Sequence, residues 1–370
     1  MIYQIRKEAT LLLEDGTVFK GKAIGKIGTT TGELAFNTGM TGYQEIFTDP
    51  SYVGQLLVMA TSHIGNYGTC DVDEESDSVK ISGLICKKFS QVYSRPGANQ
   101  SIQSYFLEKN VVGISDIDTR SLVRHIRDKG AMNAIISSDI ENLEELKSKL
   151  KNVPSMEGLE LASEVSAKEP YEMGDTSADF KVAVLDLGSK KNILRCLIER
   201  GCHLKVFPMH SSVEEMESWS PNGYMLTNGP GDPAAMPAVV ETVKALLNLN
   251  KPIFGICFGH QVLALAGGLT TQKMHNGHRG INHPVINLKT GRGEITSQNH
   301  GFVVDIDSLK DNSDIVMTHQ HLNDETVAGI EFKSKPAFSV QYHPESSAGP
   351  NDSRYLFDDF VNLMKEKNKK

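Results

Sequence analysis

The sequence predicts an α/β protein with an N-terminal mixed α/β domain and a C-terminal domain built on a mostly parallel sheet flanked by helices. Short apolar segments at 182–187, 204–207, 224–226 and 253–256 alternate with helical stretches. Such alternation is typical of parallel strands with helices on both faces. Strands and helices are mixed in the first 150 residues, which predicts a separate domain there.

A polar, acidic segment separates the two predicted domains. Residues 157–179 lack clear hydrophobic periodicity and contain Pro170 and Gly174, as linkers commonly do. The predicted organisation is an N-terminal domain at 1–151, a linker at 152–180 and a C-terminal domain at 181–366.

An Asp–Gly pair at Asp15 and Gly16 predicts a β-hairpin turn between two apolar segments. Residues 16–23 nearly match the phosphate-binding loop pattern G-x-x-x-x-G-K-[S/T], but Ala23 has no hydroxyl group to bind Mg²⁺. We therefore expect a hairpin here and no ATP site on this chain.

Capping residues mark the predicted helices of the N-terminal domain. Asp118 precedes and Gly130 follows one periodic stretch, and Asp139 precedes a stretch with leucines at helical spacing. The predicted helices are 101–110, 119–129 and the segment that contains Leu143, Leu146 and Leu150.

The segment around Cys257 gives the strongest indication of chemistry. A short apolar strand leads into Cys257, which Gly255 and Gly259 flank, and a helix follows. This is the nucleophile-elbow pattern with cysteine in place of serine, and a helix N-terminus favours the reactive thiolate. Taken alone, the pattern would also suit a small, inert core residue.

A second motif supplies a candidate base and its orienting carboxylate. Residues 337–342 predict a strand, which Pro344 ends. Because side chains two residues apart point the same way along a strand, His343 and Glu345 are expected to project together from its end. A cysteine nucleophile needs such a pair. The alternative is a strand-end histidine beside a solvated glutamate.

A Gly/Pro-rich turn after the strand at 224–226 is the candidate oxyanion loop. Attack on an amide carbonyl creates an oxyanion, which fixed backbone N–H groups stabilise. Gly229 could offer its amide without obstruction by a side chain, and the amide of Phe258 is the natural second donor. The alternative is an ordinary loop at the sheet edge.

Three motifs together resemble the class I, or triad, glutamine amidotransferases. They are N-G-P-G-D-P at 228–233, G-I-C-F-G-H-Q at 255–261 and H-P-E at 343–345. The resemblance implies Cys257 as nucleophile, His343 as base and Glu345 as its orienting partner. Members of the family hydrolyse the side-chain amide of glutamine through a thioester and pass the ammonia to a synthase. Phe258 stands where leucine is common, but the predicted role belongs to its backbone amide.

The N-terminal half resembles the small subunits of carbamoyl-phosphate synthetase. The resemblance rests on residues 32–52, 63–68 and 113–120, together with 298–302. It implies that glutamine is bound by Ser51, Gly229, Gly231, Phe258, Gln261, Asn299, Gly301 and Phe302. It also implies a large partner subunit that makes carbamoyl phosphate from bicarbonate with ATP and a metal ion, so that no cofactor or metal is expected on this chain.

Composition agrees with a cytoplasmic enzyme subunit. The net charge of -8 and the pI near 5.9 argue against a nucleic acid or an acidic membrane as partner. No apolar run approaches the ~20 residues of a membrane helix, and the first residues, 1–7, lack the apolar core of a signal peptide. Five cysteines without C-x-x-C spacing suit a reducing cytosol. His275, His278 and His283 lack a zinc-site pattern and are expected in loops.

Two alternatives stay open at this stage. One is another class I amidotransferase subunit, such as one that serves anthranilate or GMP synthesis, although those modules lack such an N-terminal domain. The other is a non-catalytic subunit that docks on a partner and regulates it, which a missing Cys, His or Glu would favour. Whether the product serves arginine or pyrimidine biosynthesis is not indicated.

Overall fold

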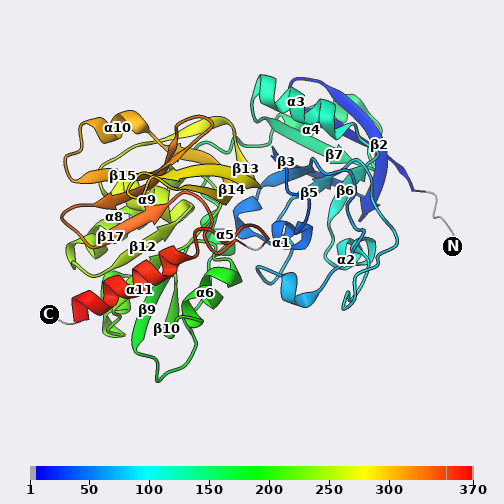
Figure 1. Cartoon of the computed structure of the whole chain (residues 1–370). Helices are drawn as coiled ribbons and strands as arrows, with labels where there is room; N and C mark the ends of the chain where they lie inside the picture. The colour runs from blue at the N-terminus through cyan, green and yellow to red at the C-terminus, as the bar shows by residue number, and fades with distance from the viewer. Residues whose placement is uncertain (1–5, 347, 369–370) are drawn as a thin grey trace. The chain divides into compact units, whose positions relative to one another are not determined.

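The computed structural model describes residues 6–346 and 348–368, and the chain divides into two units (Figure 1). The first unit comprises Met1–Met156 with His275–Arg279, and the second comprises Glu157–Met274 with Gly280–Lys370. The segment predicted as a linker contains helix α5 (Ala162–Val165) and the edge strand β8 (Tyr171–Met173), so part of it is folded.

Seven strands of the first unit close into a barrel in the order β1-β2-β6-β5-β4-β3-β7. Strands β3 to β6 pair in parallel with one another, and the other pairs are antiparallel. The strands are β1 (Glu8–Leu13), β2 (Val18–Gly25), β3 (Thr29–Asn37), β4 (Gln55–Met59), β5 (Gly83–Ile85), β6 (Val112–Ser115) and β7 (Asn133–Ser137). The predicted hairpin is confirmed by the β1–β2 pairing, with Gly16 at φ 89° in the turn. Closure of the barrel was not predicted.

The three longest helices of the first unit begin at side-chain caps. Ser101 caps α2 and Asp118 caps α3 with a hydrogen bond from the N–H of Ser121, while Gly130 ends α3 at φ 94°. The predicted cap Asp139 is wrong, because Asn142 accepts from the first-turn amides of α4 and Asp139 accepts from hydroxyl groups instead. The helices are α1 (Tyr43–Phe47), η1 (Pro50–Tyr52), η2 (Asp71–Asp73), α2 (Ile102–Glu108), α3 (Thr119–Lys129) and α4 (Leu143–Leu150).

Alternate residues of the barrel strands pack into two different clusters. Leu56 and Val58 of β4 belong to one cluster together with Leu122 and Ile126 of α3. Their neighbours on β4 belong to a second cluster, which α1 and α2 complete. Because successive side chains of a strand point to opposite faces, α3 packs on the face of β4 that carries Leu56 and Val58, and α1 and α2 pack on the other face.

The second unit is built on a ten-stranded sheet with the order β14-β13-β15-β16-β17-β12-β11-β9-β10-β8 (Figure 1). Strands β17, β12, β11, β9 and β10 pair in parallel, which confirms the parallel strands predicted at 182–187, 204–207, 224–226 and 253–256. An antiparallel extension through β16, β15 and β13 was not predicted. The strands are β9 (Phe180–Asp186), β10 (Cys202–Pro208), β11 (Gly223–Leu226), β12 (Ile253–Ile256), β13 (Thr271–Asn287), β14 (Gly293–Val304), β15 (Ile315–His321), β16 (Val327–Phe332) and β17 (Ala337–Val340).

Helices cover both faces of the parallel strands, as predicted. Val182 and Val184 of β9 pack with α6 and α11, whereas Ala183 and Leu185 pack with α8 and α9. The helices are α6 (Lys191–Ile198), α7 (Val213–Ser218), η3 (Pro233–Ala235), α8 (Pro237–Asn248), α9 (Phe258–Ala266), α10 (Ile306–Lys310) and α11 (Tyr355–Asn368).

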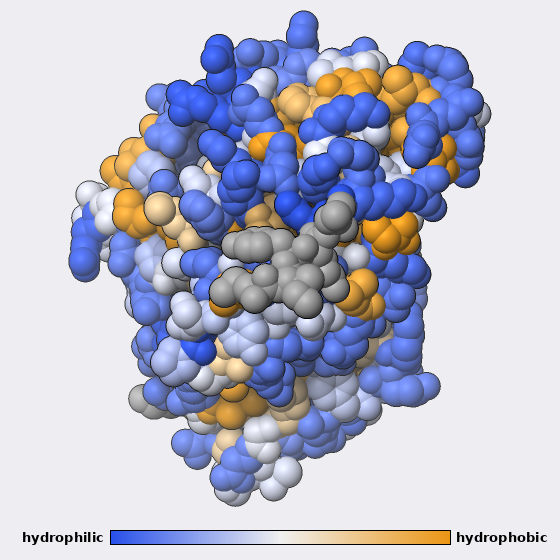
Figure 2. Space-filling view, turned by 90° about the vertical axis from the view of Figure 1, so that its right-hand side faces the viewer, coloured by the Kyte–Doolittle hydropathy of each residue, from blue (hydrophilic) through white to orange (hydrophobic). Residues whose placement is uncertain are grey.

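The surface is dominated by hydrophilic residues on the face drawn in Figure 2, where hydrophobic residues form small separate groups. Within residues 6–346 and 348–368, no helix has the length and apolar character needed to cross a membrane.

Candidate active site

Cys257 lies between strand β12 and helix α9, at the carboxyl edge of the parallel strands. Its backbone has φ 54° and ψ −102°, a conformation that a non-glycine residue rarely adopts. The N–H of Cys257 donates to the carbonyl of Val340 at 2.9 Å and helps to fix this turn. A strained, buried residue at a strand-to-helix turn is the arrangement of a nucleophile elbow.

The two flanking glycines allow the close approach of backbone that this turn requires. A Cβ atom on Gly259 would lie 2.3 Å from the carbonyl oxygen of Leu226, and one on Gly255 would lie 2.8 Å from that of Gly259. The N–H of Gly259 also donates to the carbonyl of Thr227 at 2.9 Å. The elbow therefore lies directly against the end of β11, where the candidate oxyanion loop begins.

His343 and Glu345 form a buried hydrogen-bonded pair, with Nδ1 of the ring 2.8 Å from Oε1 of the carboxylate. The predicted pairing is confirmed, but its predicted origin in strand alternation is wrong. Strand β17 ends at Val340, and both residues lie in a turn in which the N–H of Ser346 donates to the carbonyl of His343. The turn brings the two side chains together.

Lys190 is a third member of this buried group that the sequence did not reveal. Its Nζ atom lies 2.5 Å from Oε1 of Glu345, and both side chains are buried. Lys190 follows β9, and its N–H donates to the side chain of Asn228. Asn192, two residues later, donates from its side chain to the carbonyl of Glu345 at 2.6 Å. Lys190 therefore holds the side chain of Glu345, and Asn192 holds its backbone.

Burial and charge act in opposite directions on the pKa values of this pair. Burial by itself would raise the pKa of Glu345, but Lys190 and His343 outweigh it and hold that pKa below its ordinary value. Burial and Lys190 would lower the pKa of His343, but Glu345 and Cys257 outweigh them and raise it. Glu345 is thus an anion, and His343 readily holds a second proton.

The loop after β11 presents backbone amides near the elbow. Neither Gly229 nor Phe258 donates its amide to another described residue. A Cβ atom on Gly229 would lie 2.3 Å from the carbonyl oxygen of Leu187, so this position requires glycine. Gly231 has φ 91°, which also favours glycine. Both predicted glycines are therefore dictated by backbone geometry.

Strand β14 carries three of the predicted glutamine-binding residues, Asn299, Gly301 and Phe302, and it lies beside α9. The carbonyl oxygen of Asn299 is 3.5 Å from Sγ of Cys257. The carbonyl of Phe302 accepts a hydrogen bond from Nε2 of Gln261 at 2.7 Å. These contacts place Gln261 and the β14 backbone around the cysteine.

Gln341 is a second residue that the sequence analysis missed. Its Oε1 atom accepts from Nε2 of Gln261 at 3.1 Å, and its own Nε2 lies 3.9 Å from Sγ of Cys257. Both glutamine side chains are buried. Since both N–H bonds of the Gln261 amide are directed at acceptors in the chain, its Oε1 atom is the part available to a ligand.

Ser51 lies in the first unit, in helix η1, where its N–H donates to the carboxylate of Asp49. Its predicted contact with glutamine stays a prediction. The site that the second unit forms by itself contains Cys257, Phe258, Gln261, Asn299, Phe302, His343 and Glu345, with Lys190 and Gln341 beside them.

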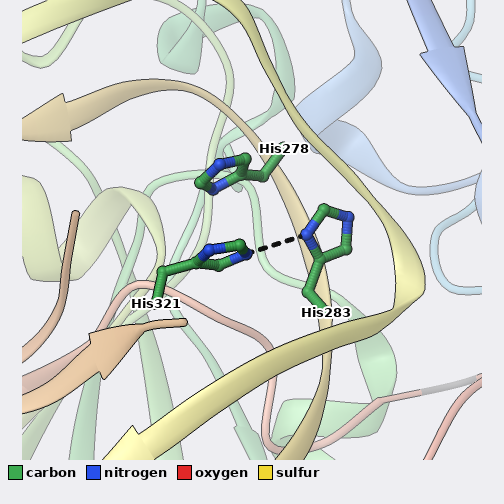
Figure 3. Close-up of side chains that lie close together, drawn as sticks. All are labelled: His278, His283 and His321. Atoms are coloured by element: carbon green, nitrogen blue, oxygen red, sulfur yellow. Dashed lines mark hydrogen bonds between the residues drawn. The ribbon is translucent and has the colours of Figure 1, made fainter. Parts of the chain in front are cut away.

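The three clustered histidines lie on strand β13 rather than in a loop, so that prediction is wrong. Nδ1 of His283 is 3.0 Å from Nε2 of His321 on β15, and Figure 3 draws this pair with His278. The other ring nitrogen of His321 lies 3.1 Å from the carboxylate of Asp324. The pair belongs to the antiparallel part of the sheet.

Two family models match the chain, one in each half. A model described as glutamine amidotransferase class-I matches residues 183–363. A model described as carbamoyl-phosphate synthase small chain, CPSase domain, matches residues 11–136. Together they cover most of both units.

Curated relatives match the chain over nearly its whole length, and each is called carbamoyl phosphate synthase small chain. The protein from Synechococcus sp. is 46% identical over 98% of this chain and 95% of its own. That from Chlorobaculum tepidum is 46% identical over 96% of this chain and 97% of its own. That from Vibrio vulnificus is 46% identical over 97% of this chain and 99% of its own.

Proposed function

Because this chain belongs to the family of carbamoyl phosphate synthase small chains, with a class-I glutamine amidotransferase domain, we propose that it hydrolyses glutamine and delivers the ammonia to a large subunit. The observation that carries the proposal is the buried arrangement of Cys257 at the elbow, in side-chain contact with His343 of the His343–Glu345 pair. A nucleophile, a base and an orienting carboxylate are what acyl transfer from an amide requires.

The first half of the reaction forms a thioester. The Cys257 thiolate attacks the side-chain carbonyl carbon of glutamine, and the carbonyl oxygen becomes an oxyanion. The amides of Gly229 and Phe258 stabilise it, since both are free to donate. His343 gives its proton to the leaving nitrogen, the C–N bond breaks and ammonia departs.

The second half of the reaction releases glutamate. His343, now neutral, takes a proton from water, and the resulting hydroxide attacks the thioester carbon. Collapse of the second oxyanion breaks the C–S bond and restores the Cys257 thiolate. Glu345 holds Nδ1 of the ring throughout, so that the opposite nitrogen is the one that exchanges protons.

Residues of β14 and α9 bind the substrate in this proposal. The residues that we propose to bind glutamine there are Gln261, Asn299, Gly301 and Phe302, and the same role is proposed for Ser51. In this proposal the large subunit uses ATP, bicarbonate and a metal ion, and no cofactor or metal is expected on this chain. Its five free cysteines suit the cytoplasm.

Two other functions are less well supported. A different amidotransferase partner would not explain the match of residues 11–136 to the small-chain domain. A purely regulatory subunit would have no need for the buried pair of His343 and Glu345. The downstream pathway, arginine or pyrimidine synthesis, is left open.

The experiment that tests the proposal measures glutamine hydrolysis by the chain alone and together with its large subunit. We expect slow hydrolysis by the chain alone and a large increase on binding, because an unregulated glutaminase would waste glutamine. Small adjustments in catalytic geometry change rates by orders of magnitude. Failure of the large subunit to bind, or absence of hydrolysis in the complex, would contradict the proposal.

A further inference from the structure

Helix α3 of the first unit carries three arginines on one face. Arg120, Arg124 and Arg127 follow one another at spacings of four and three residues, so their side chains share one side of the helix. All three are exposed. The opposite side of α3 buries Leu122 and Ile126 in the barrel cluster, which fixes the direction in which the arginines point.

A groove with a volume of about 480 Å³ runs along this arginine face. Ala60, which follows β4, and Val123 supply apolar surface, and the lining is completed by Thr119 and the three arginines. A groove lined by three arginines and two apolar side chains suits a peptide segment that carries carboxylates, because each carboxylate can pair with a guanidinium group.

The charges on these arginines are not neutralised within the chain. Among residues 6–346 and 348–368, no carboxylate forms an ion pair with Arg120, Arg124 or Arg127. Three arginines elsewhere in the protein do form ion pairs: Arg6 lies 2.6 Å from Asp116, Arg200 lies 2.8 Å from Asp358, and Arg95 pairs with Asp73. This face of α3 therefore carries three positive charges without an ion pair, although the net charge of the whole chain is -8.

The flank of α3 on the other side is mixed in charge. A second groove of about 520 Å³ shares Arg120 and Arg124 but is also lined by Asp118, Asp128 and His125. His125 is itself held by Asp15 at 2.7 Å. Positive charge is therefore least compensated on the side of Ala60 and Arg127.

The C-terminal end of α3 is tied to strand β13. The carbonyl of Arg127 accepts a hydrogen bond from the ring of His275 at 3.1 Å, and the N–H of Ala131 donates to the carbonyl of His275 at 2.7 Å. Both contacts lie within the first unit, which includes His275. The end of α3 that carries Arg127 is therefore fixed by hydrogen bonds.

We propose that the groove lined by Arg120, Arg124 and Arg127 is a docking surface for an acidic segment of the large subunit. This inference rests on the proposed function, which requires such a partner. Charge complementarity favours it, since the groove offers three cations without counterions. The acidic character of the whole chain disfavours a polyanionic nucleic acid as the occupant.

The test compares binding of the large subunit to the wild type and to the triple variant Arg120→Glu/Arg124→Glu/Arg127→Glu. Reversal of three charges in the groove is expected to weaken binding about 100-fold at low ionic strength and to remove most of its salt dependence. The charge-preserving variant Arg120→Lys/Arg124→Lys/Arg127→Lys is expected to lose far less. Hydrolysis of glutamine by the isolated variant should equal that of the wild type, which also verifies folding.

A matched control reverses three exposed lysines of the same unit. Lys147→Glu/Lys149→Glu/Lys151→Glu on and after α4 changes the net charge equally, and it should bind the large subunit normally. If the triple variant misfolds, the single change Arg124→Glu replaces it, with a weakening of about 5-fold expected.

Three outcomes would overturn the inference. The arginine variant could bind the large subunit as tightly as the wild type, or the lysine variant could be weakened equally. The arginine variant could also bind normally while inorganic phosphate raises the melting temperature of the wild type alone, which would make the groove a small-anion site. If the wild type itself binds no large subunit, the proposed function fails instead.

Discussion

Lys190 and Glu345 form a buried ion pair, with Nζ and Oε1 2.5 Å apart, although 154 residues lie between them in the chain. The same Oε1 atom accepts the hydrogen bond from the ring of His343. A single carboxylate oxygen thus lies between a lysine and the candidate base. Both residues depend on the negative charge of Glu345, because it offsets the buried ammonium group of Lys190 and orients the imidazole of His343.

Replacement of Lys190 by Met should impair both stability and catalysis. The variant leaves the Glu345 carboxylate buried without its strongest counter-charge, which typically costs about 3–5 kcal/mol. The acid limb of the pH–rate profile for glutamine hydrolysis should move to higher pH, because Lys190 is what chiefly lowers the pKa of Glu345. Lys244→Met, which removes an exposed pair with Glu241, should change the unfolding free energy by less than ~1 kcal/mol. Equal effects in both variants would refute the role of the buried pair.

The stability contributed by His343 should decrease with rising pH. Although burial opposes it, the carboxylate of Glu345 and Cys257 raise the pKa of His343 from 6.5 to about 10. A group with a raised pKa stabilises the fold fully below its unfolded value and loses that contribution as pH approaches the folded value. The apparent unfolding free energy of the wild type relative to His343→Asn should therefore fall between pH 6.5 and 10. Its slope should not exceed about 1.4 kcal/mol per pH unit. Urea unfolding of both proteins measures this, and a pH-independent difference would contradict the raised pKa.

A side chain at position 229 should reduce turnover of glutamine. In Gly229→Val, the new Cβ would lie 2.3 Å from the carbonyl of Leu187, so the loop must move and its amide must turn. Loss of one oxyanion donor typically costs about 3 kcal/mol, or a hundredfold in kcat, while KM should change little. Gly293→Val is the matched control, because nothing lies within 4 Å of a Cβ atom there. Near-normal kcat in Gly229→Val would place the donor elsewhere.

Replacement of Gln341 by Leu should weaken glutamine binding through Gln261. The variant removes the acceptor that holds Nε2 of Gln261 at 3.1 Å, so the Gln261 amide loses one of its two fixed contacts. We expect KM for glutamine to rise by about 10-fold, in line with the loss of one buried hydrogen bond, and kcat to fall less. Gln341→Glu retains an acceptor and should restore much of the affinity. An unchanged KM in Gln341→Leu would exclude this positioning role.

Much of the parallel half of the second unit could be predicted, because its signals are local. Strand β12 coincides with the apolar run before Cys257, and Asp118 and Gly130 bound α3 as expected. The elbow has a recognisable spacing because backbone contact at Gly255 and Gly259 excludes any side chain. The pairing of His343 with Glu345 was also predicted, although a turn rather than a strand produces it.

The parts that sequence reasoning missed depend on contacts between distant segments. Nothing near Lys190 indicates that it will pair with Glu345, since lysines after strands are usually solvated. Gln341 gave no signal because its partners, Gln261 and Cys257, lie on another strand–helix unit. Barrel closure depends on the pairing of β1 with β7, more than a hundred residues apart. The cap Asn142 was overlooked because Asp139 has the same capping chemistry.

Reactivity should single out Cys257 among the five cysteines. Burial raises the pKa of Cys196 to about 11 and that of Cys202 to about 12, and it raises that of Cys86 further. These thiols are therefore protonated at neutral pH and poorly reactive. A diazo-ketone analogue of glutamine should label Cys257 alone, as mass spectrometry of the digested protein would detect. Labelling of Cys196 or Cys202 in its place would refute the assignment of the nucleophile.

The central claim is that this chain supplies ammonia from glutamine to a partner that makes carbamoyl phosphate, and Cys257→Ser in the complex tests it most directly. Formation of carbamoyl phosphate is measured for the wild-type and variant complexes, once with glutamine and once with ammonium chloride as the nitrogen source. We expect the variant to lose glutamine-dependent synthesis and to keep ammonia-dependent synthesis at the wild-type rate, because only ammonia production uses the thiolate. Glutamine-dependent synthesis at the wild-type rate in the variant would contradict the account.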